Sequence, residues 1–260
     1  MTSAAPDAPA VGEDPFAART PWSARGAVTV TVLTVIAAYA VASLLQPVTA
    51  IVGRGLMGLR GVSAPGPVLL ANAMVSLLVM QIVMATLAVA LAGRYSARRR
   101  DVLSLPGQLP LSGLALGLAG LAAVTLPYSG FMWWLFPETF ATNLRFFAEL
   151  AASPAGWLAA AAVIVGAPVA EELLFRGFLL PALTKIGHGF PGAAMISTLG
   201  WTLLHFNYSI AGLTEVFIIG LFLCWLVRRT GNLWINIAVH ALYNGLQFAV
   251  LVFWPRLLGF

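Results

Sequence analysis

The chain has 260 residues, of which 60% are hydrophobic and 9% are charged, and its mean hydropathy is +0.91. These values exclude an ordinary soluble domain and predict an all-α polytopic membrane protein, a transmembrane helical bundle in contact with the lipid bilayer. The net charge is +5 at pH 7, but the basic residues lie mainly between apolar runs. They form no patch interleaved with polar side chains that could read bases, so we expect no nucleic-acid partner.

The apolar runs are long enough for about seven membrane spans. Residues 1–24 come first, contain several proline and acidic residues without a helical period, and are predicted to form a mobile polar tail. A single membrane domain is expected to fill residues 25–260. Its spans are expected at about 27–45, 67–91, 111–134, 156–183, 193–206, 213–227 and 234–254. A Gly-rich connector follows the first span and a polar connector the third.

The basic residues predict the orientation of the bundle. With the N-terminus in the cytoplasm, four arginines lie outside, namely Arg54, Arg60, Arg145 and Arg256. Ten basic residues then lie on the inner side: Arg19, Arg25, Arg94, Arg98, Arg99, Arg100, Arg176, Lys185, Arg228 and Arg229. Because cytoplasmic loops carry the excess of Lys and Arg, we predict a cytoplasmic N-terminus and an odd number of spans.

Two adjacent carboxylates, Glu171 and Glu172, lie inside the fourth span. A carboxylate in the hydrocarbon layer costs several kcal/mol, so such residues usually face a protein interior or a wet cavity and mark function. Neighbours on a helix point about 100° apart, so the two are expected to play different parts. Arg176 follows Glu172 by four residues, the spacing of an intrahelical ion pair, which would leave Glu171 free.

Two histidines and an asparagine lie in later apolar segments. Counting helical rise from the turn near Gly187 places Glu171 and His205 at similar depth. His240 and Asn244 share one helix face, nearer the inner side. The four are predicted to line one cavity open to the cytoplasm.

These residue types suggest a hydrolase that uses water and needs no Ser or Cys nucleophile. Glu171 in a partly desolvated pocket suits a general base, and His205 could help to hold the water. His240 and Asn244 could stabilise a developing oxyanion. Taken singly, each residue has a plainer interpretation: a helix-to-helix hydrogen bond, an ion-pair clamp or packing.

Three motifs in this order resemble those of the CPBP family, the glutamate-type CAAX prenyl endopeptidases and their bacterial relatives, also called Abi proteins. The resemblance covers about residues 156–250. The motifs are Glu171-Glu172-x-x-x-Arg176, Trp201-x-x-x-His205 and His240-x-x-x-Asn244. The second motif usually begins with Phe, and Trp201 keeps an aromatic surface there.

The resemblance implies an intramembrane endopeptidase with a cytoplasm-facing site, in a bacterial-type plasma membrane. It implies Glu171 as the base acting with His205, His240 and Asn244 as the oxyanion hole, and Glu172 with Arg176 as support. The substrate would be a protein or peptide, with prenylation left open. A Glu with two His could ligate zinc, but the glutamate-water mechanism needs no metal, so no cofactor is favoured. The alternatives are a non-catalytic scaffold or bacteriocin-immunity factor and, less favoured, a proton-coupled transporter.

Overall fold

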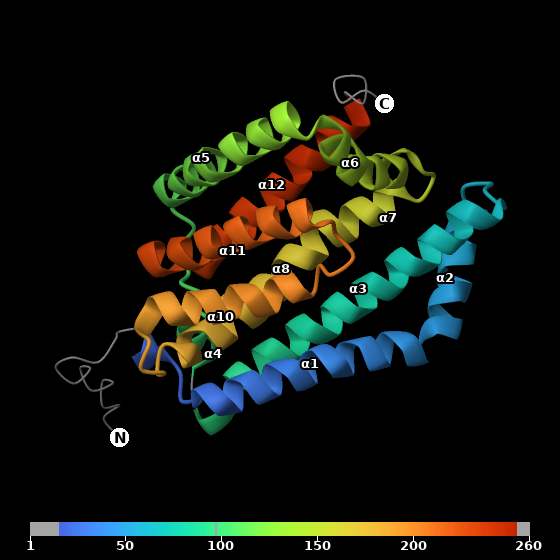
Figure 1. The fold of residues 1–260 in the computed structure, drawn as a ribbon. Helices are drawn as coiled ribbons and strands as arrows, with labels where there is room; N and C mark the ends of the chain where they lie inside the picture. Colours follow the sequence, from blue (N-terminus) through green and yellow to red (C-terminus); the bar gives the residue numbers. More distant parts are fainter. Residues whose placement is uncertain (1–15, 97, 254–260) are drawn as a thin grey trace.

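A computed structural model describes residues 16–96 and 98–253 and shows a bundle of helices with no strand in that part of the chain (Figure 1). The all-α membrane architecture expected from composition is confirmed. The longer helices are α1 (Ala24–Leu44), α2 (Gln46–Gly58), α3 (Pro65–Ala92), α5 (Leu111–Leu135), α6 (Pro137–Ala152), α10 (Gly189–Leu203), α11 (Ile210–Thr230) and α12 (Leu233–Phe253). The double glutamate lies in the composite helix between α6 and α10.

Six helices of the described residues are long and apolar enough to cross a membrane: α1, α3, α5, the composite helix Gly156–Leu183, α11 and α12. The remaining expected span is α10, which has 15 residues. At 1.5 Å per residue α10 covers roughly 22 Å, less than the roughly 30 Å of a hydrocarbon core. The bundle therefore contains one short helix where a seventh full span was expected.

Both expected connectors contain helices of their own. The connector after the first span is α2, which packs against α1 and α3, and the connector after the third is α6, which packs against α5 and α12. Each has a proline in its first turn, where the missing N–H costs no hydrogen bond. These helices cover the same end of the bundle, because α1 and α5 run toward it and α3 starts from it (Figure 1).

The opposite end of the bundle is where α1 begins and α3 ends, and we name it the arginine-rich end. It carries nine of the ten basic residues predicted to be cytoplasmic, because Arg176 is instead buried inside the bundle. The last residues of the predicted tail, 16–23, pack here. Phe16 and Trp22 are buried, Lys185 Nζ donates to the carbonyl of Thr20 at 2.6 Å, and Trp22 Nε1 donates to the carbonyl of Leu91 at 3.1 Å.

The composite helix alternates α-helical and wider π-helical turns: α7 (Gly156–Ala160), η3 (Ala161–Gly166), α8 (Ala167–Glu171), η4 (Glu172–Leu179) and α9 (Leu180–Leu183). Pro168 and Pro181 each follow a π segment. A proline lacks the N–H of the α-helical ladder, and wide turns let the helix continue. Gln81 of α3 also supports this helix, because its Nε2 donates to the carbonyl of Ala162 in η3 at 3.2 Å. The two glutamates thus lie at the junction of α8 and η4.

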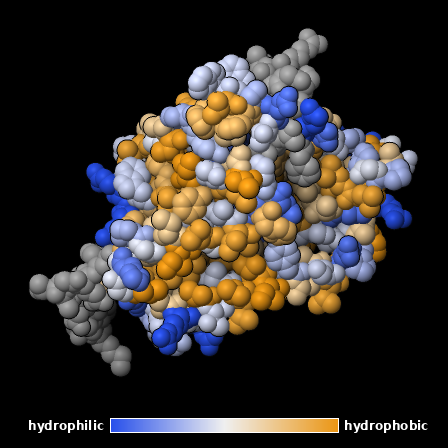
Figure 2. Space-filling view, in the orientation of Figure 1, coloured by the Kyte–Doolittle hydropathy of each residue, from blue (hydrophilic) through white to orange (hydrophobic). Residues whose placement is uncertain are grey.

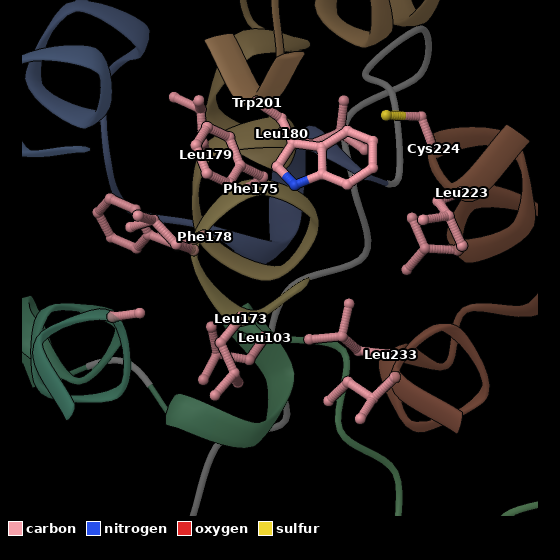
Figure 3. Packing of buried hydrophobic residues seen from close by; sticks show 14 of the residues in the cluster. Leu103, Leu173, Phe175, Phe178, Leu179, Leu180, Trp201, Leu223, Cys224 and Leu233 are labelled. Carbon is pink, nitrogen blue, oxygen red and sulfur yellow. The ribbon is translucent and has the colours of Figure 1, made fainter. Parts of the chain in front are cut away.

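The hydrophobic core is centred on this composite helix. Figure 3 shows Phe175, Phe178 and Leu180 packed among side chains from several other elements, including Trp201 of α10 and Leu223 of α11. The face seen in Figure 2 is also apolar over a broad area, with hydrophilic residues toward its periphery. A chain that is apolar both inside and outside is what a lipid environment requires.

Candidate active site

Glu172 is fully buried at the centre of a polar network. Arg176 Nη1 donates to its Oε1 at 3.0 Å, so the ion pair expected from the four-residue spacing is present. Asn236 Nδ2 donates to its Oε2 at 3.2 Å, and His240 Nδ1 lies 3.1 Å from its Oε1. This carboxylate therefore links the composite helix to α12, as a buried charge must be paired and hydrogen-bonded.

Arg176 continues the network toward α10 and α11. Its Nη2 donates to the carbonyl of Gly220 at 3.4 Å, and its guanidinium lies over the Trp201 ring, 4.2 Å from the centroid. Gly220 makes this approach possible, because a Cβ there would come within 2.6 Å of Thr198 and 2.9 Å of Trp201. The Trp201 ring is thus held between a cation and a helix backbone.

Glu171 is half-buried and meets the same tryptophan. Trp201 Nε1 donates to Glu171 Oε2 at 2.6 Å, a short hydrogen bond to a carboxylate. The sequence predicts Trp201 only as an aromatic surface. Its indole N–H is a donor that phenylalanine lacks, so Trp201 positions the carboxylate as well as packing against it.

The two predicted histidines meet Trp201 edge to face. The ring centroids are 5.1 Å apart for His205 and 5.8 Å for His240. His205 Nδ1 also lies 3.1 Å from the carbonyl of Trp201. Glu171, His205 and His240 come from three separate elements, and the structure brings all three to one indole. The bond from His240 Nδ1 to Glu172 leaves its Nε2 as the nitrogen that can meet a substrate.

Asn244 lies one turn beyond His240 on α12. Its Nδ2 donates to the carbonyl of Val163 in η3 at 2.8 Å, and an amide has a second N–H to offer. Val163 precedes Glu171 by about two helical turns. The structure therefore ties Asn244 to the helix that carries Glu171, but not to Glu171 itself.

Sequence reasoning missed three polar residues beside the site. Tyr208 packs edge to face on His205 at 5.2 Å, and its phenol has an O–H that can donate a hydrogen bond. Tyr243, next to Asn244, donates to Glu215 Oε1 at 2.8 Å. Glu215 is a third carboxylate in an apolar span, which was a signal available from the sequence.

A metal ion would need several His, Cys or carboxylate ligands close together. Within residues 16–96 and 98–253, no three His, Cys, Asp or Glu side chains are grouped so that they could hold an ion. The two carboxylates are instead hydrogen-bonded, Glu171 by Trp201 and Glu172 by Arg176 and Asn236. The absence of a cofactor stays a prediction.

Comparison with known families identifies this region. Residues 153–246 match the family described as Type II CAAX prenyl endopeptidase Rce1-like, in nearly the stretch expected from the three motifs. The match confirms the resemblance to the CPBP family. No curated protein and no solved structure matches the chain.

Proposed function

We propose, from the premise that residues 153–246 form an Rce1-like domain of a membrane protease, that Glu171 activates the water that cleaves a peptide bond. The observation that supports this role is the meeting of Glu171, His205 and His240 around the indole of Trp201. A general base must lie within hydrogen-bond reach of the proton that it abstracts, so the attacking water has to be held beside the carboxylate. His205, half-buried beside Trp201, is placed to hold that water.

In this mechanism Glu171 takes a proton from water as the water oxygen attacks the peptide carbonyl. His240 carries a proton on each ring nitrogen in this mechanism, because Nδ1 donates to the Glu172 carboxylate. Its Nε2–H and the second amide N–H of Asn244 then stabilise the negative carbonyl oxygen. Glu172 and Arg176 hold the rings in place and take no part in proton transfer. Glu171 returns the proton to the leaving amine, so the carboxylate is regenerated.

The experiment is a comparison of membrane proteomes from cells that express the wild-type protein or the Glu171→Gln variant. We expect one precursor to accumulate with E171Q and His205→Ala, while both variants insert at wild-type abundance. Glu138→Gln, at an exposed position in the first turn of α6, is the matched control for loss of a carboxylate. Normal processing in both E171Q and H205A would contradict the proposed role of the site.

A non-catalytic scaffold or immunity factor is the second candidate, and one observation favours it. His240 and Asn244 both make hydrogen bonds that join α12 to the composite helix, to Glu172 and to Val163. If these bonds are only structural, His240→Ala and Asn244→Ala lower protein abundance, and any phenotype follows abundance. A catalytic role requires loss of processing at unchanged abundance.

The side of the membrane toward which the site opens determines where the substrate comes from. The sequence predicts a cytoplasm-facing site, and this stays a prediction that depends on which end of the bundle admits water.

A further inference from the structure

The carbonyl of Val163 is the point where η3 departs from the helical hydrogen-bond ladder. An α-helical carbonyl accepts from the N–H four residues later, and a π-helical carbonyl from the N–H five residues later. Within the described composite helix Val163 has neither donor, because the N–H of Ala167 donates to Ala162 and Pro168 has no N–H. A carbonyl at membrane depth must be satisfied by protein, so the Val163 oxygen needs a donor from another helix.

Asn244 of α12 is that donor. Its Nδ2 donates to the Val163 carbonyl at 2.8 Å, across the contact between α12 and η3. The side-chain amide is planar, and its two N–H groups point in different directions from one nitrogen. When the first N–H is bound to Val163, the amide can no longer rotate, so the direction of the second N–H is set. The proposed mechanism assigns this second N–H to the negative oxygen of the substrate.

The second π segment of the same helix provides a reference for this arrangement. At the end of η4 the N–H of Leu180 donates to Phe175, five residues earlier, and Pro181 again has no N–H. The backbone pattern is therefore the same at both prolines. The two differ in the neighbouring helix, because the amide of Asn244 binds at the end of η3 that Pro168 follows.

We propose that Pro168 is a positioning residue of the candidate active site. Because it has no N–H, it leaves the Val163 carbonyl to Asn244, and this bond orients the amide that faces the substrate oxygen. A helical carbonyl that is not held by the ladder can tilt away from the helix axis, which suits a bond to α12. Pro168 itself touches no reacting atom. The inference rests on the proposed function for its effect on catalysis.

Pro168→Ala is the test, because it restores the missing N–H. The variant is expected to fold, since alanine suits a helix interior better than proline. The restored N–H should draw the Val163 carbonyl toward the helix axis and weaken its bond to Asn244. The substrate is the precursor that accumulates with E171Q, supplied to the purified protein in proteoliposomes. We expect kcat to fall by about 2- to 10-fold, the range for one neutral hydrogen bond.

KM should stay unchanged in P168A, because the bond to the substrate oxygen is made only in the transition state. Pro181→Ala, which restores an N–H at the other π segment, is the matched control and should keep the wild-type kcat and KM. A wild-type kcat in P168A would overturn the inference, as would an equal loss of kcat in P181A or a loss in P168A that comes with a raised KM.

A second readout does not depend on catalysis. It is the unfolding temperature of the detergent-solubilised wild-type protein, P168A, Asn244→Ala and the double variant. If Pro168 acts through Asn244, the shift caused by P168A in the native chain differs from the shift that it causes in N244A. Equal shifts would overturn the inference. If E171Q cleaves normally, the proposed function fails, and the unfolding temperatures alone decide whether Pro168 holds Asn244 in place.

Discussion

At the scale of single residues, Trp201 is the side chain on which the candidate site depends. It donates to Glu171, contacts His205 and His240 edge to face, and receives the guanidinium of Arg176 on its ring. Four of the residues expected from the three motifs, Glu171, His205, His240 and Arg176, therefore meet at one indole, whereas Asn244 is tied to Val163. Its nitrogen distinguishes the role of Trp201 from that of the phenylalanine more usual at this place in the motif.

Trp201→Phe isolates the indole N–H, because it keeps an aromatic ring for Arg176 and the histidines. Hydrogen bonds to charged groups contribute about 1.5–3 kcal/mol. We therefore expect precursor processing to fall by roughly 10- to 100-fold at unchanged abundance, since each 1.4 kcal/mol is tenfold in rate. Quantitative proteomics of the accumulated precursor measures this. Trp225→Phe, a half-exposed tryptophan on α11, is the control, and equal processing in W201F and W225F would refute the role.

Arg176→Leu tests the buried ion pair, because it leaves Glu172 charged and without its cation. Removing one partner of a buried pair typically costs about 3–5 kcal/mol. We expect a large fall in the unfolding temperature of the detergent-solubilised protein, with Arg229→Gln, at an exposed arginine, unchanged. The double variant Glu172→Gln/Arg176→Leu should recover part of the loss, because it removes the stranded charge. A single variant as stable as the wild type would show that Glu172 is not held by Arg176.

At the scale of elements, the site depends on the close approach of the composite helix, α10 and α11. The composite helix carries both glutamates at a junction between α-helical and π-helical turns, while α11 meets α10 at Gly220. This glycine has no special backbone angle; it leaves room for Trp201 and accepts from Arg176 through its carbonyl. The position of the tryptophan is thus decided by the helix facing it.

Gly220→Ala should therefore disturb the site from a distance. A methyl group there would collide with Thr198 and Trp201, and overpacking a tight contact costs about 1–3 kcal/mol. We expect lower thermal stability together with reduced processing. Gly130→Ala is the matched control, since it lies in helix α5 with nothing within 4 Å of the added Cβ. If G220A and G130A behave alike, the close approach does not matter.

At the scale of the whole molecule, the helix directions separate the two ends of the chain. α1 begins at the arginine-rich end and α12 finishes at the other (Figure 1). Six long helices alone would return the chain to its starting side, so the 15-residue α10 must complete a crossing. This short helix ends at Leu203, close to Trp201, whose indole donates to Glu171.

Reporter fusions test this arrangement in cells. A fluorescent protein that folds only in the cytoplasm should be bright when fused before residue 1 and dark after residue 260. A phosphatase that folds only outside should give the reverse, since α10 completes an odd number of crossings and the positive charges set the orientation. Equal signals at both termini would mean that α10 does not cross.

The sequence by itself determined the membrane class, the span positions to within a few residues and the Glu172–Arg176 pair. All three follow from local patterns, namely apolar runs of sufficient length and an i, i+4 spacing within one helix. It also indicated candidate site residues, through motifs that lie within the stretch 153–246 that matches the family. The roles of these residues stay a prediction.

Only the tertiary structure decided that Trp201 donates to Glu171, that His240 binds Glu172 and that Asn244 is tied to Val163. These features depend on the register and depth of separate helices. A rotation of 100° or a shift of one turn would break them while leaving the apolar pattern of every span unchanged.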